Sequence, residues 1–227
     1  MSPIKPISLA DQIYTELRRK ILTCALVPGE RLLEKKLCAD LDVSRTSLRE
    51  ALNRLAQERL ITLKPNCGYS VTPITRANFK AVCEMRRVLE SKVAGLAAKR
   101  ADEQAIAAMR EAAIVDCSMA DSDSHSVYCE SNKAFHQSIV NSIDNEFLSD
   151  AVMLALDKDH QPLFYGIDLE VCTDPQAVTN EHLAIVDAIT ARQARKAEKL
   201  MDEHIARKEQ RLLAAFGFPM KSVVPEL

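Results

Sequence analysis

Apolar residues recur every three to four positions along the first sixty residues, a spacing that predicts amphipathic helices. Residues 9–24 carry one such stripe, and residues 33–41 carry a shorter one. The clearest stripe lies in the span 44–59 and consists of Leu48, Ala51, Leu52 and Leu55. Ser44 is a favourable N-cap for this helix, because its hydroxyl can accept a hydrogen bond from a first-turn N–H. We therefore predict three short helices, with a tight turn at residues 42–43 between the second and the third.

Two β-prone runs, 61–63 and 69–72, follow the third helix and flank a turn that contains Gly68. This pattern predicts a hairpin in which Gly68 supplies a positive φ. Three helices followed by a hairpin form a winged helix-turn-helix, whose recognition helix lies in the DNA major groove. Arg45 and Arg49 are four residues apart, so both leave the predicted third helix from one face, away from its apolar stripe.

Strand patterns vanish beyond residues 73–75, and long Ala-rich amphipathic segments take over. They predict helices at 78–99 and at about 102–120, 125–142, 145–165, 175–190 and 193–216. Such a series indicates an all-α antiparallel helical bundle. We therefore expect a mainly α protein with a winged helix-turn-helix domain at 1–75, a helical domain at 76–221 and a tail at 222–227.

The net charge of −2 hides an asymmetry, because residues 1–75 carry a net charge of +4 and the remainder −6. This is consistent with a polyanion-binding domain beside an acidic body, although chance alone can produce such a difference. No apolar run is long enough for a membrane span, and the first ten residues lack the features of a signal peptide. We therefore expect a cytoplasmic protein. Its seven cysteines form no CxxC pair, which favours small core residues or free thiols.

Three of the five histidines, His136, His182 and His204, lie within apolar helical faces. They are either three independent core residues, each with its own hydrogen bond, or ligands that converge on one metal in the bundle. Asn132 precedes His136 by four residues and leaves the same helical face. Imidazole nitrogens suit Zn, Ni and similar divalent ions. His125 and His160 fit no such pattern, and we expect them at the surface or in loops.

The N-terminal domain resembles the GntR family of bacterial transcription regulators at residues 21–22, 28–32, 43–55 and 68–71. Cys24 and Arg59 depart from this family, because each stands where the family has glycine at a turn. The DNA-binding residues that we expect are Lys35, Arg45, Thr46, Arg49 and Gly68.

Each of these residues has an expected role on the duplex. A guanidinium can bind guanine bidentately, so Arg45 and Arg49 are candidates for base or phosphate contacts, although Arg45 can also be a solvated surface charge. Thr46 would contact phosphate or a thymine methyl, and Gly68 would bring the wing to the minor groove. Lys35 matches a basic family position near the DNA backbone. Because one such domain reads few base pairs, we expect a homodimer on a palindromic double-stranded DNA operator.

The helical domain resembles the FCD effector domain of the FadR subfamily at residues 84–90, 132–136, 180–189 and 197–204. The resemblance implies a divalent metal site, with Zn or Ni the expected ion, formed by Asn132, His136, His182 and His204. A neutral Asn132 oxygen in place of a carboxylate weakens the affinity expected for a dication. Arg86 matches an inward-facing family arginine, which implies that it binds a small carboxylate effector. The alternative for Arg86 is a buried ion pair with Glu90 or Glu130.

We therefore expect a transcription regulator, most simply a repressor, whose operator affinity responds to a small organic acid bound at the metal. The alternative is an architectural DNA-binding dimer with a structural metal and no effector. An enzyme built on a three-histidine zinc site is a further alternative. It needs a general base, but the sequence contains no HExxH motif and no carboxylate at the same helical spacing. We therefore expect no catalytic residues.

Overall fold

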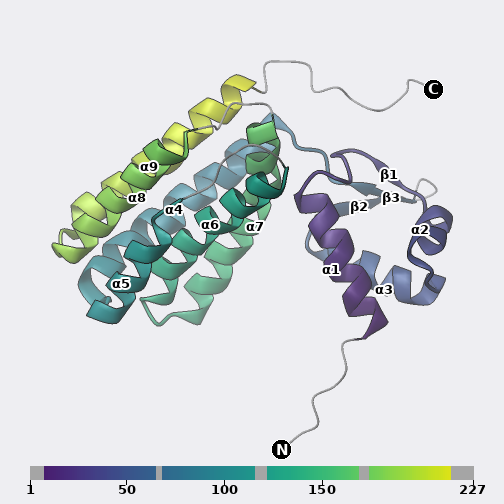
Figure 1. Ribbon diagram of the computed structural model, residues 1–227, viewed down its shortest axis with the longest axis horizontal. Helices are drawn as coiled ribbons and strands as arrows, with labels where there is room; N and C mark the ends of the chain where they lie inside the picture. Colours follow the sequence, from purple (N-terminus) through teal and green to yellow (C-terminus); the bar gives the residue numbers. More distant parts are fainter. Residues whose placement is uncertain (1–7, 65–67, 116–121, 169–173, 216–227) are drawn as a thin grey trace, which may run out of the picture. The chain divides into compact units, whose positions relative to one another are not determined.

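The computed structural model describes residues 8–64, 68–115, 122–168 and 174–215 (Figure 1). The chain divides between Ile74 and Thr75 into two compact units, which we call the N-terminal and the C-terminal unit. The predicted tail at 222–227 lies outside the described residues. Within the described ranges, no helix is both long enough and apolar enough to span a membrane.

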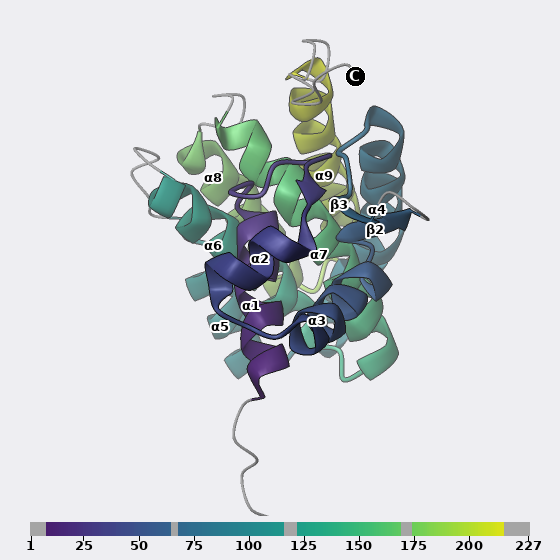
Figure 2. The ribbon, with the colours of Figure 1, turned by 90° about the vertical axis from the view of Figure 1, so that its right-hand side faces the viewer.

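The N-terminal unit contains three helices and a small antiparallel sheet, and the turn that joins its second and third helices can be followed in Figure 2. The elements are α1 (Leu9–Leu22), β1 (Arg31–Leu32), α2 (Glu34–Leu41), α3 (Arg45–Gln57), β2 (Ile61–Lys64) and β3 (Gly68–Val71). β3 is the central strand, and its Tyr69 pairs with Leu63 of β2 and with Leu32 of β1. The winged helix-turn-helix fold is confirmed, and β1 is an addition that the sequence pattern did not predict.

Local capping chemistry fixes where the helices of this unit begin. The Ser8 hydroxyl accepts from the Asp11 N–H and the Asp11 carboxylate accepts from the Ser8 N–H, which together form a capping box at α1. Ser44 caps α3 as predicted, because its hydroxyl accepts from the Ser47 N–H at 3.2 Å. The predicted apolar stripe of α3 is fully buried and packs against α1 in one core.

Three turns of this unit hold a non-glycine residue in the left-handed region: Asp42 (φ 50°) after α2, and Cys24 (φ 53°) and Arg59 (φ 57°) after α1 and α3. The Arg59 N–H bonds to the Ala56 carbonyl and the Leu60 N–H to the Leu55 carbonyl, which is a Schellman motif at the end of α3. A Cβ in this region costs about 1–2 kcal/mol. The two positions that depart from the glycine of the resembling family are therefore positions where glycine would relieve backbone strain.

The C-terminal unit consists entirely of helices in the part of the chain described. They are α4 (Arg76–Arg100), α5 (Glu103–Ala112), α6 (Ser122–Asn141), α7 (Glu146–Asp168), α8 (Pro175–Thr190) and α9 (Ala194–Ala215). Their apolar faces form one core, and the predicted helical bundle is confirmed. Gly95 lets α4 approach α9 closely, because a Cβ there would lie 2.4 Å from Glu198 Oε1. The helix predicted at 102–120 is too long: α5 ends at Ala112, and the Val115 N–H instead bonds to Thr179 Oγ1 on α8.

Candidate functional sites: an exposed arginine pair and a buried histidine cluster

The first candidate site is the surface formed by the start of α3 and the adjacent α2. Arg45, Thr46 and Arg49 are exposed on α3, and Lys35 is exposed on α2. No hydrogen bond or ion pair of Arg45 is found among the described residues. Arg49, in contrast, donates from Nε to Glu34 Oε2 at 2.8 Å. The two arginines predicted to contact DNA therefore differ, since only Arg49 is held by a neighbouring carboxylate.

Gly68 begins β3 at the tip of the predicted wing and has a φ of +79°. The predicted positive φ at this residue is confirmed. A Cβ built there would meet no atom within 4 Å, so backbone conformation, not crowding within the chain, favours glycine at this position.

The second candidate site is a cluster of three buried histidines from three helices of the C-terminal unit. His136 of α6, His182 of α8 and His204 of α9 are each at most 3% exposed. One nitrogen from each ring lies within 4.8 Å of the corresponding nitrogens of the other two. Imidazoles on one tetrahedral zinc, with bonds of 2.0–2.1 Å, have nitrogens about 3.4 Å apart, so small ring movements would bring these three onto one ion.

Burial keeps the cluster neutral. It lowers the pKa of His136 to about 4, against the opposing attraction of Glu90. Burial and the two neighbouring imidazoles hold the pKa of His182 well below its usual value. Burial also lowers the pKa of His204, although Glu181 opposes that shift. Neutral imidazoles are the form that binds a metal.

His182 is the member whose environment most favours a missing ligand. Its ring stacks on Phe135 with centroids 3.7 Å apart; one side of the ring interacts with the Ala113 backbone, and neither ring nitrogen makes a side-chain hydrogen bond among the described residues. Leaving a buried polar atom unpaired costs about 1–3 kcal/mol. The three-histidine donor set and the His182 nitrogen that lacks a partner therefore fit a divalent ion.

Carboxylates from outside the cluster orient the other two rings. Glu181 Oε2 lies 2.6 Å from His204 Nδ1, and its other oxygen accepts from Arg207 at 2.7 Å. Glu90 Oε2 of α4 lies 2.5 Å from His136 Nδ1. A carboxylate on the far nitrogen of a ligating histidine fixes the ring and raises its basicity. The Nε2 atoms are thereby directed toward the centre of the cluster.

Arg86 lies beside this cluster in a network of buried charges. It is 1% exposed, and its guanidinium bonds to Glu90 at 2.5 Å and to Asp159 at 2.6 Å. Asp159 also accepts from Lys208 of α9. Of the two partners considered from the sequence, Glu90 pairs with Arg86, whereas Glu130 lies 3.8 Å from His160. Burial opposes ionisation of Glu90, but Arg86 and His136 outweigh it and hold the pKa of this carboxyl below its usual range.

Arg86 also contacts a predicted metal ligand directly. Its Nη2 lies 3.2 Å from His136 Nε2, the ring nitrogen that does not face Glu90. A metal at this nitrogen and the Arg86 contact exclude each other, because both use the same lone pair. Arg86 must therefore move away before His136 can bind an ion through Nε2.

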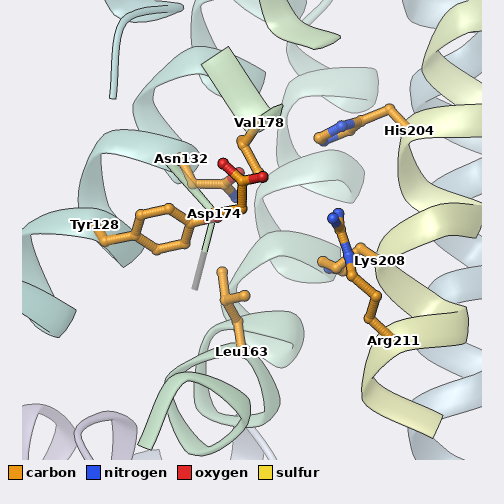
Figure 3. A pocket seen from close by; sticks show the side chains of 8 residues that line it. All are labelled: Tyr128, Asn132, Leu163, Asp174, Val178, His204, Lys208 and Arg211. Carbon is orange, nitrogen blue, oxygen red and sulfur yellow. The ribbon is translucent and has the colours of Figure 1, made fainter. Parts of the chain in front are cut away.

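A small cavity of about 20 Å³ adjoins the cluster, enough for one water molecule. Its wall, drawn in Figure 3, is formed by Tyr128, Asn132, Leu163, Asp174, Val178, His204, Lys208 and Arg211. Asn132 is 5% exposed and lines the cavity together with His204. The structure thus places the predicted Asn132 beside the histidine cluster.

The expectation for His160 was wrong, because this residue is 6% exposed within α7. His125 is half-buried in α6, with its ring against Phe164. Three further residues of this network were not predicted from the sequence: Glu181, Asp159 and Lys208. Glu181 adjoins His182, and Lys208 is four residues beyond His204, so helical spacing carried a signal for those two. Asp159 had no signal, because its partners come from other helices.

Comparisons with known proteins identify the family of each unit. Residues 9–71 match the bacterial regulatory proteins of the gntR family, and residues 81–207 match the FCD domain. The chain is 26% identical over 208 residues to the HTH-type transcriptional repressor RspR of Escherichia coli strain K12, covering 90% of this chain and 88% of that protein. It is 25% identical over 222 residues to the galactonate operon transcriptional repressor of the same strain, covering 89% and 96%.

A solved structure gives the same fold. E. coli McbR/YncC superposes with a TM-score of 0.73 at 20% identity, covering 93% of this chain and 100% of that one. Among these comparisons, the two family matches carry the assignment, because together they span both units. The chain belongs to the GntR family of bacterial regulatory proteins and contains an FCD domain, which makes it a DNA-binding transcription regulator with an effector-binding domain and not an enzyme.

Proposed function

We propose that this regulator is a cytoplasmic repressor whose operator affinity is set by a small carboxylate bound at a divalent metal in the C-terminal unit. The observation that carries the proposal is the convergence of three buried histidines from three helices, with one nitrogen of each ring within 4.8 Å of the others. Burying such a cluster without a ligand costs free energy of folding, and a bound ion would recover it by coordinating the ring nitrogens. Two relatives that are named as repressors support the direction of control.

The metal would be held by His136, His182 and His204, with Asn132 as a fourth ligand, and Zn or Ni is the ion that imidazole ligands favour. The ion would offer open coordination positions to a carboxylate oxygen. Arg86 would supply a planar fork for the same carboxylate. To do so it must exchange Glu90 or Asp159 for the effector, since both acceptors now occupy its guanidinium.

Residues 1–75 would form one of the two DNA-binding domains of a homodimer. Arg45 and Arg49 would contact base edges or phosphate, and Thr46 and Lys35 would contact the backbone. Gly68 would let the wing approach the minor groove. A homodimer would place two such units on a palindromic operator, one helical turn or a multiple of it apart. Residues 76–221 would serve effector binding and dimerisation.

The effector would act through its different affinities for two states of the dimer. Coupling of this kind is typically about 1–3 kcal/mol, so we expect the operator affinity to change by about five- to a hundredfold. The sign expected for a repressor is weaker DNA binding in the presence of the effector.

The test measures operator binding by fluorescence anisotropy on the full-length protein, with a duplex selected from a random library. Arms contain metal-free, Zn-loaded and Ni-loaded protein, each with acetate, lactate, butyrate or succinate. Elemental analysis and thermal melts report metal uptake. A carboxylate that changes operator affinity only in a metal-loaded arm supports the proposal. Metal uptake that raises the melting temperature, with no carboxylate effect on DNA binding, would instead establish an architectural dimer with a structural metal.

A further inference from the structure

The cavity beside His204 has a cationic wall that extends away from the histidine cluster. His204, Lys208 and Arg211 follow one another at i, i+4 and i+7 on α9, so they form one stripe, and all three line the cavity. Figure 3 shows this stripe on one side of the cavity, with Tyr128 and Asn132 of α6 on the other. The end of the cavity that is remote from the metal ligands is therefore basic.

The two cations of this stripe are not equivalent. Lys208 is 5% exposed and already donates to Asp159, which also accepts from Arg86. The buried Nε of Arg211, in contrast, has no hydrogen-bond partner within the described residues. A guanidinium donor that is buried without an acceptor is costly to leave unpaired. Arg211 thus presents a free donor beside the cavity.

An acidic residue, Asp174, also lines the cavity, so a carboxylate bound there depends on the positive charges of Lys208 and Arg211. Asp174 caps α8, and its Oδ1 accepts from the Ala177 N–H at 2.9 Å. The rest of the wall contains the aliphatic side chains of Leu163 and Val178. A short hydrocarbon chain with an anion at each end can use the groups that this wall offers: the histidine end, two aliphatic side chains and a guanidinium.

We infer that the effector is a short α,ω-dicarboxylate, with one carboxylate at the His204 end of the cavity and the other on Arg211. This inference rests on the proposed function and deepens it. His204 and Arg211 are about 10 Å apart along the helix axis at 1.5 Å per residue. Both side chains lean toward the N-terminus, but the longer Arg211 side chain reaches further toward His204, which shortens the span between the two end groups to roughly that of a four- to six-carbon diacid.

The small size of the cavity has a consequence for signalling. At about 20 Å³ it cannot hold such a molecule as it stands. The diacid must therefore bind a form in which the walls contributed by α6, α8 and α9 have separated. A ligand that binds only this widened form shifts the population toward it, which is the difference in affinity that regulation needs.

The test is isothermal titration calorimetry on the full-length, metal-loaded protein. Succinate, glutarate and adipate are compared with butyrate, valerate and caproate, which have the same numbers of carbons but only one carboxylate. We expect at least one diacid to bind tenfold or more tightly than its monocarboxylate partner. In Arg211→Met this advantage falls at least tenfold, while monocarboxylate binding is unchanged. Arg195→Met removes an exposed arginine from the same helix and leaves the diacid advantage intact.

The other possible results contradict either the Arg211 subsite or carboxylate binding as a whole. If diacids and monoacids bind equally well, or if Arg211→Met weakens both alike, the second subsite does not exist but the metal-carboxylate function stands. If no carboxylate binds the metal-loaded protein, carboxylate sensing and the subsite both fail. Arg211→Gln serves as a second variant, and thermal melts of both variants confirm that a lost preference is not lost folding.

Discussion

Arg49 on α3 donates to Glu34 on α2 at 2.8 Å, although the Arg49 side chain is 60% exposed. The pair joins the first helix of the helix-turn-helix to the helix expected to enter the major groove. A carboxylate on Nε holds the guanidinium in one orientation, which lowers the entropy lost when it meets a base edge. Glu34 also offsets one positive charge on the surface that we propose faces DNA. It therefore favours discrimination between sequences over total affinity.

We predict that Glu34→Gln raises affinity for non-specific DNA and lowers the ratio of operator to non-specific affinity. The added net charge steepens the dependence of log K on log salt by about one unit, and the released Arg49 loses part of a base contact worth about 1–3 kcal/mol. Anisotropy titrations on operator and scrambled duplexes between roughly 50 and 200 mM salt provide the test.

The matched control is Glu50→Gln, which adds the same charge at an exposed position on α3. Both variants should bind non-specific DNA more tightly, but only Glu34→Gln should lose discrimination. An equal fall in the specificity ratio for both variants would show that Glu34 acts through charge alone and does not position Arg49.

A second prediction concerns the left-handed residues that end α1 and α3. Cys24→Gly and Arg59→Gly should each stabilise the N-terminal unit by about 0.5–1 kcal/mol, because glycine adopts a positive φ without a Cβ penalty and the gain exceeds its entropy cost. The Arg59 carbonyl, which accepts from Thr72 Oγ1, is kept in the glycine variant. Urea denaturation of the full chain, followed by a probe in each unit, measures the change.

Arg192 provides the contrasting case for this prediction. Its φ is also positive, at 58°, but its guanidinium donates to the Ala101 carbonyl at 2.7 Å at the end of α4. Arg192→Gly should therefore destabilise the C-terminal unit, because the lost hydrogen bond to a helix end outweighs the relief of strain. A stabilising Arg192→Gly would mean that backbone strain alone decides all three positions.

The third prediction tests the competition between Arg86 and a metal for His136 Nε2. In Arg86→Met the competing contact is gone, and the unpaired Glu90 and Asp159 make the centre more negative. Metal affinity should rise about tenfold, equivalent to about 1.4 kcal/mol. Stability of the metal-free protein should fall by about 3–5 kcal/mol, the typical loss when one partner of a buried ion pair is removed. Competition with a chromophoric chelator and melts in EDTA give the two values.

Arg87→Met is the control for this variant. Arg87 is next to Arg86 in the sequence but pairs with Asp202 at the surface, with its side chain 41% exposed. We expect its removal to change metal affinity less than twofold and stability by about 0–1 kcal/mol. Unchanged metal affinity in Arg86→Met would show that His136 binds the ion through a geometry in which Arg86 need not move.

The sequence predicts the N-terminal unit well because its signals are local. The Ser44 cap and the stripe from Leu48 to Leu55 locate α3 to within two residues of its observed end. β1 escapes prediction because it has two residues and depends on β3, about forty residues further along the chain. The helix predicted at 102–120 is too long for the same reason, because beyond α5 the Val115 N–H bonds to Thr179 of another helix.

For the histidine centre, helical spacing places each ring on an inward face but does not reveal what lies opposite. Glu90 is recognisable as a partner of Arg86 because the two are four residues apart on α4. Asp159 is not, because the Arg86–Asp159–Lys208 chain depends on how α4, α7 and α9 are rotated against one another. His160 misleads for a related reason: its neighbours Lys158 and Asp159 are charged, yet the helix turns this part of its surface inward.

The last prediction distinguishes a histidine whose role is to bind a metal from one that stabilises the fold. His182→Leu should raise the stability of the metal-free protein by about 1 kcal/mol, because it removes a buried nitrogen that lacks a partner and keeps an apolar contact with Phe135, which together outweigh the lost interaction with the Ala113 backbone. The same variant should lose the increase in melting temperature that Zn or Ni produces in the wild type.

His136→Leu is the matched comparison, since its ring contacts Glu90 and Arg86. It should abolish metal stabilisation as well, but it should destabilise the metal-free protein, because the buried charges lose a polar neighbour. Melts in EDTA and in excess metal distinguish the two variants. A metal-free His182→Leu protein less stable than wild type would mean that this imidazole is already satisfied by the fold, and one argument for a metal at this centre would be lost.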